Sequence, residues 1–422
     1  DLSEMIEQLT LLAPRAVAIN LLFSFFDETE ELRIERAIID KFGESSMFIS
    51  RSSDVLPEYK VFERGMTTAI NAKVGPLMQG YLQRLENALA GQGKKSVALS
   101  IMQSSGGTTS AEQAGRYPVN LLLSGPAGGL KGAQYVAGAS GDEQLLSFDM
   151  GGTSTDVSII DREIGFTTGA KIGGYPVAVP MVDIHTIGAG GGSIARIDAG
   201  GLLLVGPESA GASPGPACYG KGGKWPTVTD ANVVLGRLLP QAFLGGGMQL
   251  DKAAAIEAVN TVAVPSGLSI EQAARGIIDV VNDHMVRALR VMSVERGEDP
   301  RDFILVSFGG AGGLHVCALA EELEMRKALV PVNAGVLSAL GMLAAEASRE
   351  RSRTINKRLK ECDADGIEQI FEELLNHAVE ELGAGVAEIK TSQTVDVRYQ
   401  GQSNALNLPW LGMQDIEAAF HQ

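Results

Sequence analysis

The sequence has few cysteines, few aromatic residues and no long apolar run, and each shortage excludes a class of protein. Its three cysteines, Cys218, Cys317 and Cys362, lie far apart, so they give neither a disulfide framework nor the spacing of metal ligands. A reducing compartment fits this usage, and we expect the protein to be cytoplasmic. No apolar stretch approaches the roughly 20 residues of a membrane span, and no signal-peptide pattern is present. We therefore expect no membrane partner.

Positive charge is also scarce. The chain has 35 Lys and Arg residues against 51 Asp and Glu residues, which gives a formal net charge of −16. A nucleic-acid-binding surface needs a basic face, so we expect no nucleic-acid partner. The acidic balance does not exclude ATP, because local N–H groups and a metal hold a small anion.

Glycine is abundant, with 51 residues among 422, and 45% of the chain is hydrophobic. This composition predicts a globular chain of two or three domains with many tight turns. The sequence begins at Asp1 rather than Met and stops at Gln422 within a helical pattern. We expect both ends to be cuts through a longer protein.

The most informative stretch is 145–160, LLSFDMGGTSTDVSII. Two apolar runs around a Gly-Gly turn predict a β-hairpin. Gly151 and Gly152 let backbone N–H groups approach an anion, and Thr153 adds a hydroxyl. Asp149, at the end of a buried strand, is placed to hold hydrated Mg²⁺ or to orient a nucleophile. The alternative is a polar hairpin whose Asp and Thr side chains cap their own turn.

Predicted strands alternate with predicted helices along the chain, which indicates an α/β architecture. Strands are expected at 16–26, 97–102, 119–123, 177–187 and 303–308. Asp230, Asp251 and Ser269 are predicted helix N-caps. Charged residues increase from Arg349 onward. We place domains at 1–144, 145–348 and 349–422.

The order of elements resembles one half of the actin, sugar kinase and Hsp70 superfamily. In that resemblance, 149–156 stands for the second phosphate loop and 308–315 (FGGAGGLH) for the adenosine loop. It implies an actin-like ATPase fold built from ribonuclease-H-like halves. The two glycine turns would then converge across one cleft to grip a triphosphate nucleotide.

Several longer stretches resemble the hydantoinase A/5-oxoprolinase family, which includes a subunit of acetone carboxylase. They are LSGPAGG at 123–129, DMGGTSTD at 149–156, VDIHTIGAGGGSI at 182–194, SPGPACYG at 213–220, TDANVVL at 229–235 and the stretch 308–315. The resemblance implies ATP-dependent opening of a cyclic amide such as a hydantoin or 5-oxoproline. In the carboxylase relatives it implies activation of a ketone. It also implies a B-type partner subunit or domain.

The resemblance gives roles to individual residues. Asp149 would orient Mg²⁺ or the nucleophile, and Asp156 would brace the hairpin. The groups expected to contact ATP are Gly151, Gly152 and Thr153 at the β- and γ-phosphates, and Gly309, Gly310, Gly312 and Gly313 along the nucleotide.

Three further residues have open interpretations. Asp183 and His185 alternate along a predicted strand, so both would point to one face and contact substrate or metal. Alternatively, His185 satisfies a buried partner and Asp183 caps the glycine turn at 188–192. His315 either caps or packs its helix or takes part in catalysis.

One family feature is missing. The first phosphate loop, another D-x-G-G-T turn, is absent, and the turn at 103–109 lacks the leading Asp. Residues 1–144 therefore resemble the remainder of a truncated N-terminal lobe. Phosphoryl transfer depends on positioning from both sides, so we expect this chain alone to turn over poorly or not at all. Two other functions stay open, namely a non-catalytic nucleotide switch like Hsp70 or actin, and a small-molecule kinase.

Overall fold

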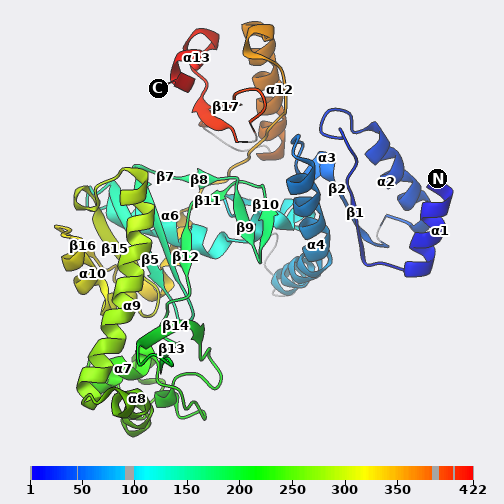
Figure 1. Cartoon of the computed structure of the whole chain (residues 1–422). Helices are drawn as coiled ribbons and strands as arrows, with labels where there is room; N and C mark the ends of the chain where they lie inside the picture. Colours follow the sequence, from blue (N-terminus) through cyan, green and yellow to red (C-terminus); the bar gives the residue numbers. More distant parts are fainter. Residues whose placement is uncertain (1, 45, 91–98, 383–388, 403, 422) are drawn as a thin grey trace.

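The computed structural model describes residues 2–44, 46–90, 99–382, 389–402 and 404–421. Figure 1 shows three groups of elements: an N-terminal group at one side, a group around the main sheet at the other, and a C-terminal group above them. Within the described residues, no single helix has the length and apolar character to cross a membrane. Two helices, Lys252–Ser266 and Ile270–Arg296, meet that test only as a pair bent by 90°.

The N-terminal group is mainly helical. It contains α1 (Leu2–Leu12), β1 (Ala16–Ile19), α2 (Thr29–Phe42), β2 (Phe48–Arg51), α3 (Ser52–Val55), α4 (Val61–Ala90), β3 (Ser100–Met102), β4 (Thr108–Ser110) and α5 (Ala111–Arg116). Strands β1 and β2 pair in parallel, and β3 and β4 pair antiparallel.

One strand prediction in this part of the chain is too long, and another is wrong. The strand expected at 16–26 ends at Ile19, because two buried charged side chains hold a turn there. Arg64 donates to the carbonyl of Leu21 at 2.6 Å, and Glu31 accepts from its N–H at 2.8 Å. Phe23 in this turn has a φ of 62°. The strand expected at 119–123 is instead a 3-10 helix at Pro118–Leu121.

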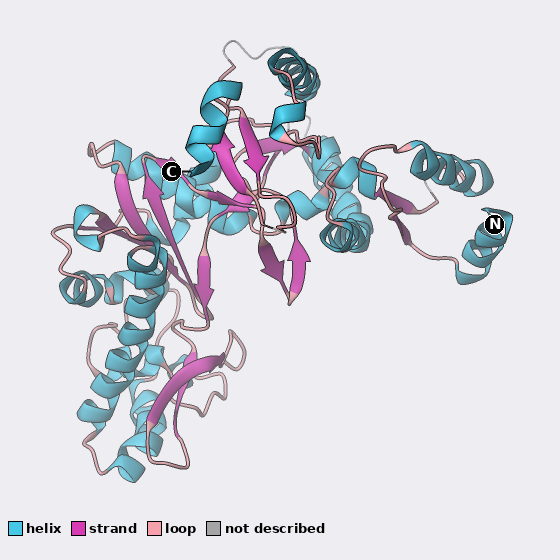
Figure 2. Cartoon of the chain, turned by 45° about the horizontal axis from the view of Figure 1, so that its top comes forward, coloured by secondary structure: helices cyan, strands magenta, loops and turns pink. Residues whose placement is uncertain are grey.

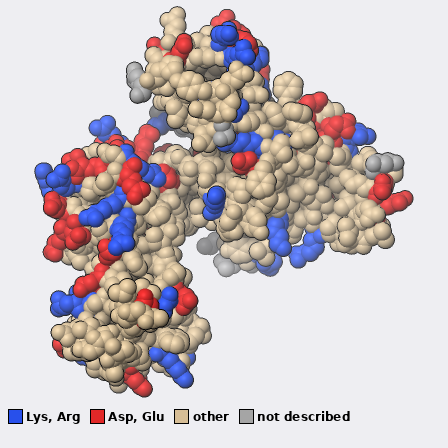
Figure 3. Space-filling view, viewed as in Figure 1, with Lys and Arg blue, Asp and Glu red and all other residues tan. Residues whose placement is uncertain are grey.

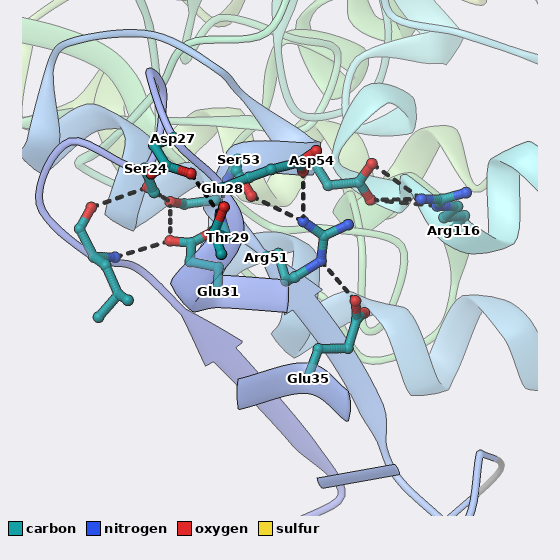
Figure 4. A network of polar contacts seen from close by, with 12 residues as sticks. Ser24, Asp27, Glu28, Thr29, Glu31, Glu35, Arg51, Ser53, Asp54 and Arg116 are labelled. Carbon is teal, nitrogen blue, oxygen red and sulfur yellow. Dashed lines mark hydrogen bonds and ion pairs between the residues drawn. The ribbon is translucent and has the colours of Figure 1, made fainter. Parts of the chain in front are cut away.

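Figure 4 shows the ion pairs that join these N-terminal elements. Arg51, at the end of β2, pairs with Glu28 at 3.0 Å and with Glu35 at 2.7 Å. Arg116, at the end of α5, pairs with Asp54 at 2.9 Å. These pairs tie α2, α3 and α5 to the carboxyl end of β2.

The main sheet has the strand order β12-β6-β5-β15-β16, with β7 also paired to β6. Its strands are β5 (Gln144–Met150), β6 (Thr155–Asp161), β7 (Glu163–Ile164), β12 (His185–Ile187), β15 (Ile304–Phe308) and β16 (Ala328–Leu329). β5 and β6 form the predicted hairpin, which is confirmed. β15 lies parallel to β5, which brings residues more than 150 positions apart side by side.

Alternation along β5 divides the core into two layers. Leu146 and Phe148 face α9 (Ile270–Met292), which lies with α7 (Val228–Val234), α8 (Lys252–Ser266) and α10 (Val316–Glu322). Leu145 faces α6 (Ser124–Gly138) and α11 (Leu337–Ala344). Helices therefore cover both faces of the sheet, as expected for an α/β fold.

The crossing of α6 and α11 is close because glycines line it. A Cβ on Gly132 would lie 2.5 Å from the carbonyl oxygen of Leu337, and one on Gly128 would lie 2.8 Å from that of Ser338. Gly341 of α11 faces the backbone of both α6 glycines. Side chains at these positions would force the two helices apart.

The region after the hairpin is more broken than expected. It forms β8 (Phe166–Thr167), β9 (Ala170–Ile172), β10 (Tyr175–Val177), β11 (Met181–Val182), β13 (Ser193–Ile197) and β14 (Leu203–Ser209). The single strand expected at 177–187 is therefore wrong. The β13–β14 hairpin projects beside the helical end of this group (Figures 1 and 2).

The C-terminal group contains α12 (Ala364–Leu382), β17 (Thr394–Val397), β18 (Leu406–Pro409) and α13 (Met413–His421). β17 and β18 pair antiparallel. Arg398 stacks over the ring of Tyr59, 4.2 Å from its centroid, which joins this group to the N-terminal one. In Figure 3, charged side chains of both signs are mixed around the rim, and the middle of this face is largely uncharged. The three-domain division remains a prediction.

Candidate active site

The turn between β5 and β6 offers free backbone donors. The N–H of Gly151 donates to the carbonyl of Ser154 at 3.0 Å and closes the turn. Within the described part of the chain, the N–H groups of Gly152 and Thr153 have no hydrogen-bond partner. Successive free N–H groups in such a turn form a binding place for an anion.

The turn after β15 lies against this first turn. Phe308 is the register partner of Asp149, and the N–H of Ala311 donates to the carbonyl of Met150 at 3.0 Å. Gly309 has a φ of 79°, and a Cβ there would lie 2.6 Å from the carbonyl oxygen of Met150 and overlap the carboxylate of Asp149. The prediction that the two glycine turns lie together is confirmed.

A third glycine turn, at 188–192, packs against the first turn and forms hydrogen bonds with its backbone. The N–H groups of Gly191 and Gly192 donate to the carbonyls of Gly151 and Gly152 at 3.0 and 2.7 Å. A Cβ on Gly190 would lie 2.7 Å from backbone atoms of Gly152 and Thr153. The sequence pattern gave no sign of this contact between the third turn and the first.

Asp149 and Asp156 face each other across the hairpin. They are register partners on β5 and β6, so their side chains share one face of the sheet. Both line a small cavity whose other walls are largely apolar: Pro126, Leu130, Val157, Ser158, Ile184 and Phe308. Asp149 has no hydrogen bond or ion pair among the described residues, whereas Asp156 accepts a bond from the hydroxyl of Thr186 at 2.6 Å.

This environment disfavours negative charge. Burial raises the pKa of Asp149 to about 6, and the nearby charge of Asp156 adds to the effect. Burial also raises the pKa of Asp156, which the bond from Thr186 partly offsets. Two half-buried carboxylates without a cationic partner are a place where a bound cation would be strongly stabilised.

The donor set fits Mg²⁺ bound together with phosphate. Mg²⁺ is usually held by one or two carboxylates plus substrate phosphates and water. The described residues contain no group of three or more His, Cys, Asp or Glu side chains that would hold a metal alone. Asp149 and Asp156 beside free N–H groups therefore match a metal that arrives with a phosphate ligand.

The structure does not bring Asp183 and His185 to Asp149. The strand breaks between them, since β11 ends at Val182 and β12 begins at His185. The carboxylate of Asp183 forms an ion pair with Arg296, beyond the end of α9. His185 is the register partner of Val157, so its side chain lies on the opposite face from Asp156. Their proposed catalytic roles gain no geometric support.

His315 is fully buried at the start of α10. Its Nδ1 lies 2.7 Å from the amide oxygen of Asn282 on α9, and its Nε2 has no partner among the described residues. Burial lowers the pKa of His315 to about 4, with a smaller effect from Arg237. The imidazole is therefore neutral at pH 7 and packs α10 against α9, which favours the packing interpretation.

Asp230 anchors the long loop at 206–225, a role that the sequence analysis missed. The N-cap of α7 is Thr227, and Asp230 occupies the N3 position, where its side chain completes the capping box. The prediction of Asp230 as the N-cap is therefore wrong. The buried carboxylate of Asp230 accepts from the N–H of Cys218 at 2.8 Å and from that of Ala217 at 3.2 Å. Burial and this carboxylate raise the pKa of the Cys218 thiol, so the thiol is not activated.

A model of the hydantoinase/oxoprolinase family matches residues 64–351, which include all three glycine turns. The chain belongs to the hydantoinase/oxoprolinase family. The family resemblance inferred from the sequence is thereby confirmed.

Two relatives and one solved structure show how far the similarity extends. The uncharacterized protein MJ0964 of Methanocaldococcus jannaschii is 41% identical over 96% of this chain and 61% of its own length. Caprolactamase subunit alpha of Pseudomonas jessenii is 37% identical over 92% and 56%. The crystal structure of the ATP-dependent caprolactamase from Pseudomonas jessenii matches with a TM-score of 0.89 at 35% identity, over 100% of this chain and 63% of that one.

A nucleotide-free structure of acetone carboxylase matches with a TM-score of 0.76 at 28% identity, over 99% of this chain and 62% of that one. The chain therefore has the mixed α/β fold of these enzymes. It spans about three fifths of the length of MJ0964, of the caprolactamase subunit and of the two matched structures.

Proposed function

We propose that this chain is the A-type subunit, or part of it, of an ATP-dependent enzyme that opens a cyclic amide. One observation carries the proposal: a glycine turn with two free N–H groups meets a second glycine turn beside a pair of half-buried carboxylates. That arrangement suits a triphosphate with its metal. Similarity to an ATP-dependent caprolactamase supports both the nucleotide and the class of substrate.

Each part of the site has a role in this proposal. The N–H groups of Gly152 and Thr153 donate to the β- and γ-phosphates, in the turn that Gly151 closes. Gly309, Gly310, Gly312 and Gly313 leave room for the nucleotide against the backbone. Asp149 would hold Mg²⁺, and the chemistry that the metal would supply is neutralisation of charge on the phosphates. The proposed fold is actin-like, with the nucleotide between ribonuclease-H-like halves.

The chemistry follows from the poor reactivity of amides. The amide oxygen attacks the γ-phosphorus of ATP and ADP leaves, which makes the amide carbon a better electrophile. Water then adds to that carbon and the ring C–N bond breaks, with the ring nitrogen taking up a proton, which leaves an acyl phosphate. A second water attacks the acyl phosphate and releases the carboxylate and inorganic phosphate. A hydantoin, 5-oxoproline or a lactam would serve as substrate. A B-type partner supplies the rest of the site.

The test is ADP release by the full-length protein together with its B-type partner. The panel contains hydantoin, 5-oxoproline and caprolactam, with acetone plus bicarbonate as the carboxylase alternative. We expect ADP release to depend on one cyclic amide and to fall at least about 100-fold in Asp149→Asn. Release that depends only on acetone and bicarbonate, or on a peptide client as in Hsp70, would refute the proposal.

A further inference from the structure

Thr186 contacts the candidate site through a single hydrogen bond. It lies on β12, the edge strand next to β6, and is the register partner of Asp156. Its hydroxyl donates to Oδ1 of Asp156 at 2.6 Å, and Oδ2 of Asp156 has no partner among the described residues. One carboxylate oxygen is thus fixed and the other is free.

The bond has little value for stability alone. Thr186 is exposed, and hydrogen bonds that exchange with water contribute about 1 kcal/mol or less to folding. Its geometric effect is larger, because β6 lies between β12 and β5, so Asp156 has Thr186 on one side and the unpaired carboxylate of Asp149 on the other. The bond fixes Oδ1 on the side of β12 and leaves Oδ2 as the oxygen available beside Asp149. Without a bond to hold it, the Asp156 side chain would turn away from a like charge into solvent.

We propose that Thr186 is a positioning residue that holds Asp156 toward the Mg²⁺ bound by Asp149. The inference rests on the proposed nucleotide function and replaces the earlier role of Asp156 as a brace of the hairpin. Partners that orient a metal ligand typically contribute about 10- to 100-fold to metal affinity.

The test measures how much Mg²⁺ strengthens binding of a fluorescent, non-hydrolysable ATP analogue to the full-length protein. Affinity is determined with saturating Mg²⁺ and again in EDTA. We expect Thr186→Val and Asp156→Asn to reduce the enhancement by Mg²⁺ about 10- to 100-fold, with affinity in EDTA unchanged. Thr186→Ser keeps the hydroxyl and should behave like the wild type.

The matched control is Thr394→Val in β17, where Thr394 accepts a cross-strand bond from Asn407 at 3.1 Å. It loses a comparable exposed hydrogen bond far from the carboxylates and should leave the enhancement unchanged. If Thr186→Val lowers the affinity for the analogue equally with saturating Mg²⁺ and in EDTA, the role of Thr186 is merely structural. That result would refute the positioning role. Wild-type protein that binds no analogue refutes the proposed function, and wild-type binding with an unaffected Thr186→Val refutes this inference alone.

Discussion

At the scale of single residues, the candidate active site depends on a carboxylate without a partner and on glycines at positions where any side chain would clash. Asp149 has no partner among the described residues and faces Asp156 in a largely apolar cavity. Gly190 and Gly309 each lie where a methyl group would meet backbone or carboxylate atoms. The sequence identified Asp149 and the glycines from their spacing. It did not reveal Thr186, because its partner lies on another strand.

The pKa of Asp149 predicts a dependence of stability on pH. Its folded value, about 6, lies above its ordinary value of 3.8, so the ionised carboxylate destabilises the metal-free fold as the pH rises from about 4 through 6. Measured by urea unfolding in EDTA, Asp149→Asn should be more stable than the wild type at pH 7.5, on the order of 1 kcal/mol. The difference should vanish near pH 4. A variant that is less stable at pH 7.5 would contradict the buried environment of Asp149.

Gly190→Ala should weaken nucleotide binding without touching the nucleotide. The added methyl group displaces Gly152 and Thr153, whose N–H groups are the proposed phosphate donors. We expect the affinity for an ATP analogue to fall about 10- to 100-fold in a fluorescence titration, corresponding to one or two lost charge-assisted hydrogen bonds. Gly80→Ala is the control, because a Cβ there meets only the flexible end of Arg84, at 3.3 Å. Equal affinities of Gly190→Ala and Gly80→Ala for the analogue would show that the turn at 188–192 does not support the phosphate donors.

At the scale of elements, the sequence correctly predicted a hairpin and helix caps that depend on residues close together in the chain. The β5–β6 hairpin and the caps at Asp251 and Ser269 follow from a glycine turn and capping residues, and the structure has them. The strand expected at 16–26 was too long because an apolar run does not show where a chain turns. Buried Arg64 and Glu31 set that turn from other elements. The break between β11 and β12 also lacked a signal in the pattern of apolar residues.

The crossing of α6 and α11 gives a prediction for packing. Gly132→Ala should destabilise the fold by about 1 to 3 kcal/mol in chemical denaturation, because the methyl group meets the carbonyl of Leu337 on the facing helix. Gly138→Ala at the end of the same helix has open space around it and should be neutral or stabilising. A Gly132→Ala variant as stable as Gly138→Ala would show that the helices separate at no cost.

At the scale of the whole molecule, family membership and fold rest on the arrangement of the complete chain. The family model covers 64–351, and the caprolactamase fold extends over the full length of this chain. β1 and β2 form a parallel pair with no third strand among the described residues, whereas parallel sheets are normally larger and covered on both faces. In the proposed catalytic cycle, phosphate contacts from a second side would therefore come from outside this strand pair.

The proposed function predicts that this chain depends on its partner. ATP hydrolysis by this chain alone should be at least about 100-fold slower than by the chain with its B-type partner, because its sequence has one D-x-G-G-T turn and a second phosphate clamp would have to come from elsewhere. ADP release at matched protein concentration measures this difference. Equal rates would show that the second clamp is not needed.

The central claim is that the two glycine turns hold a nucleotide against Asp149. Calorimetric titration of the full-length protein with a non-hydrolysable ATP analogue and Mg²⁺ tests it most directly, with Gly309→Ala as the variant. The account predicts saturable binding at one site in the wild type and loss of that binding in Gly309→Ala, with Gly80→Ala unchanged. Wild-type protein that fails to bind, or a Gly309→Ala variant that binds equally well, would contradict it.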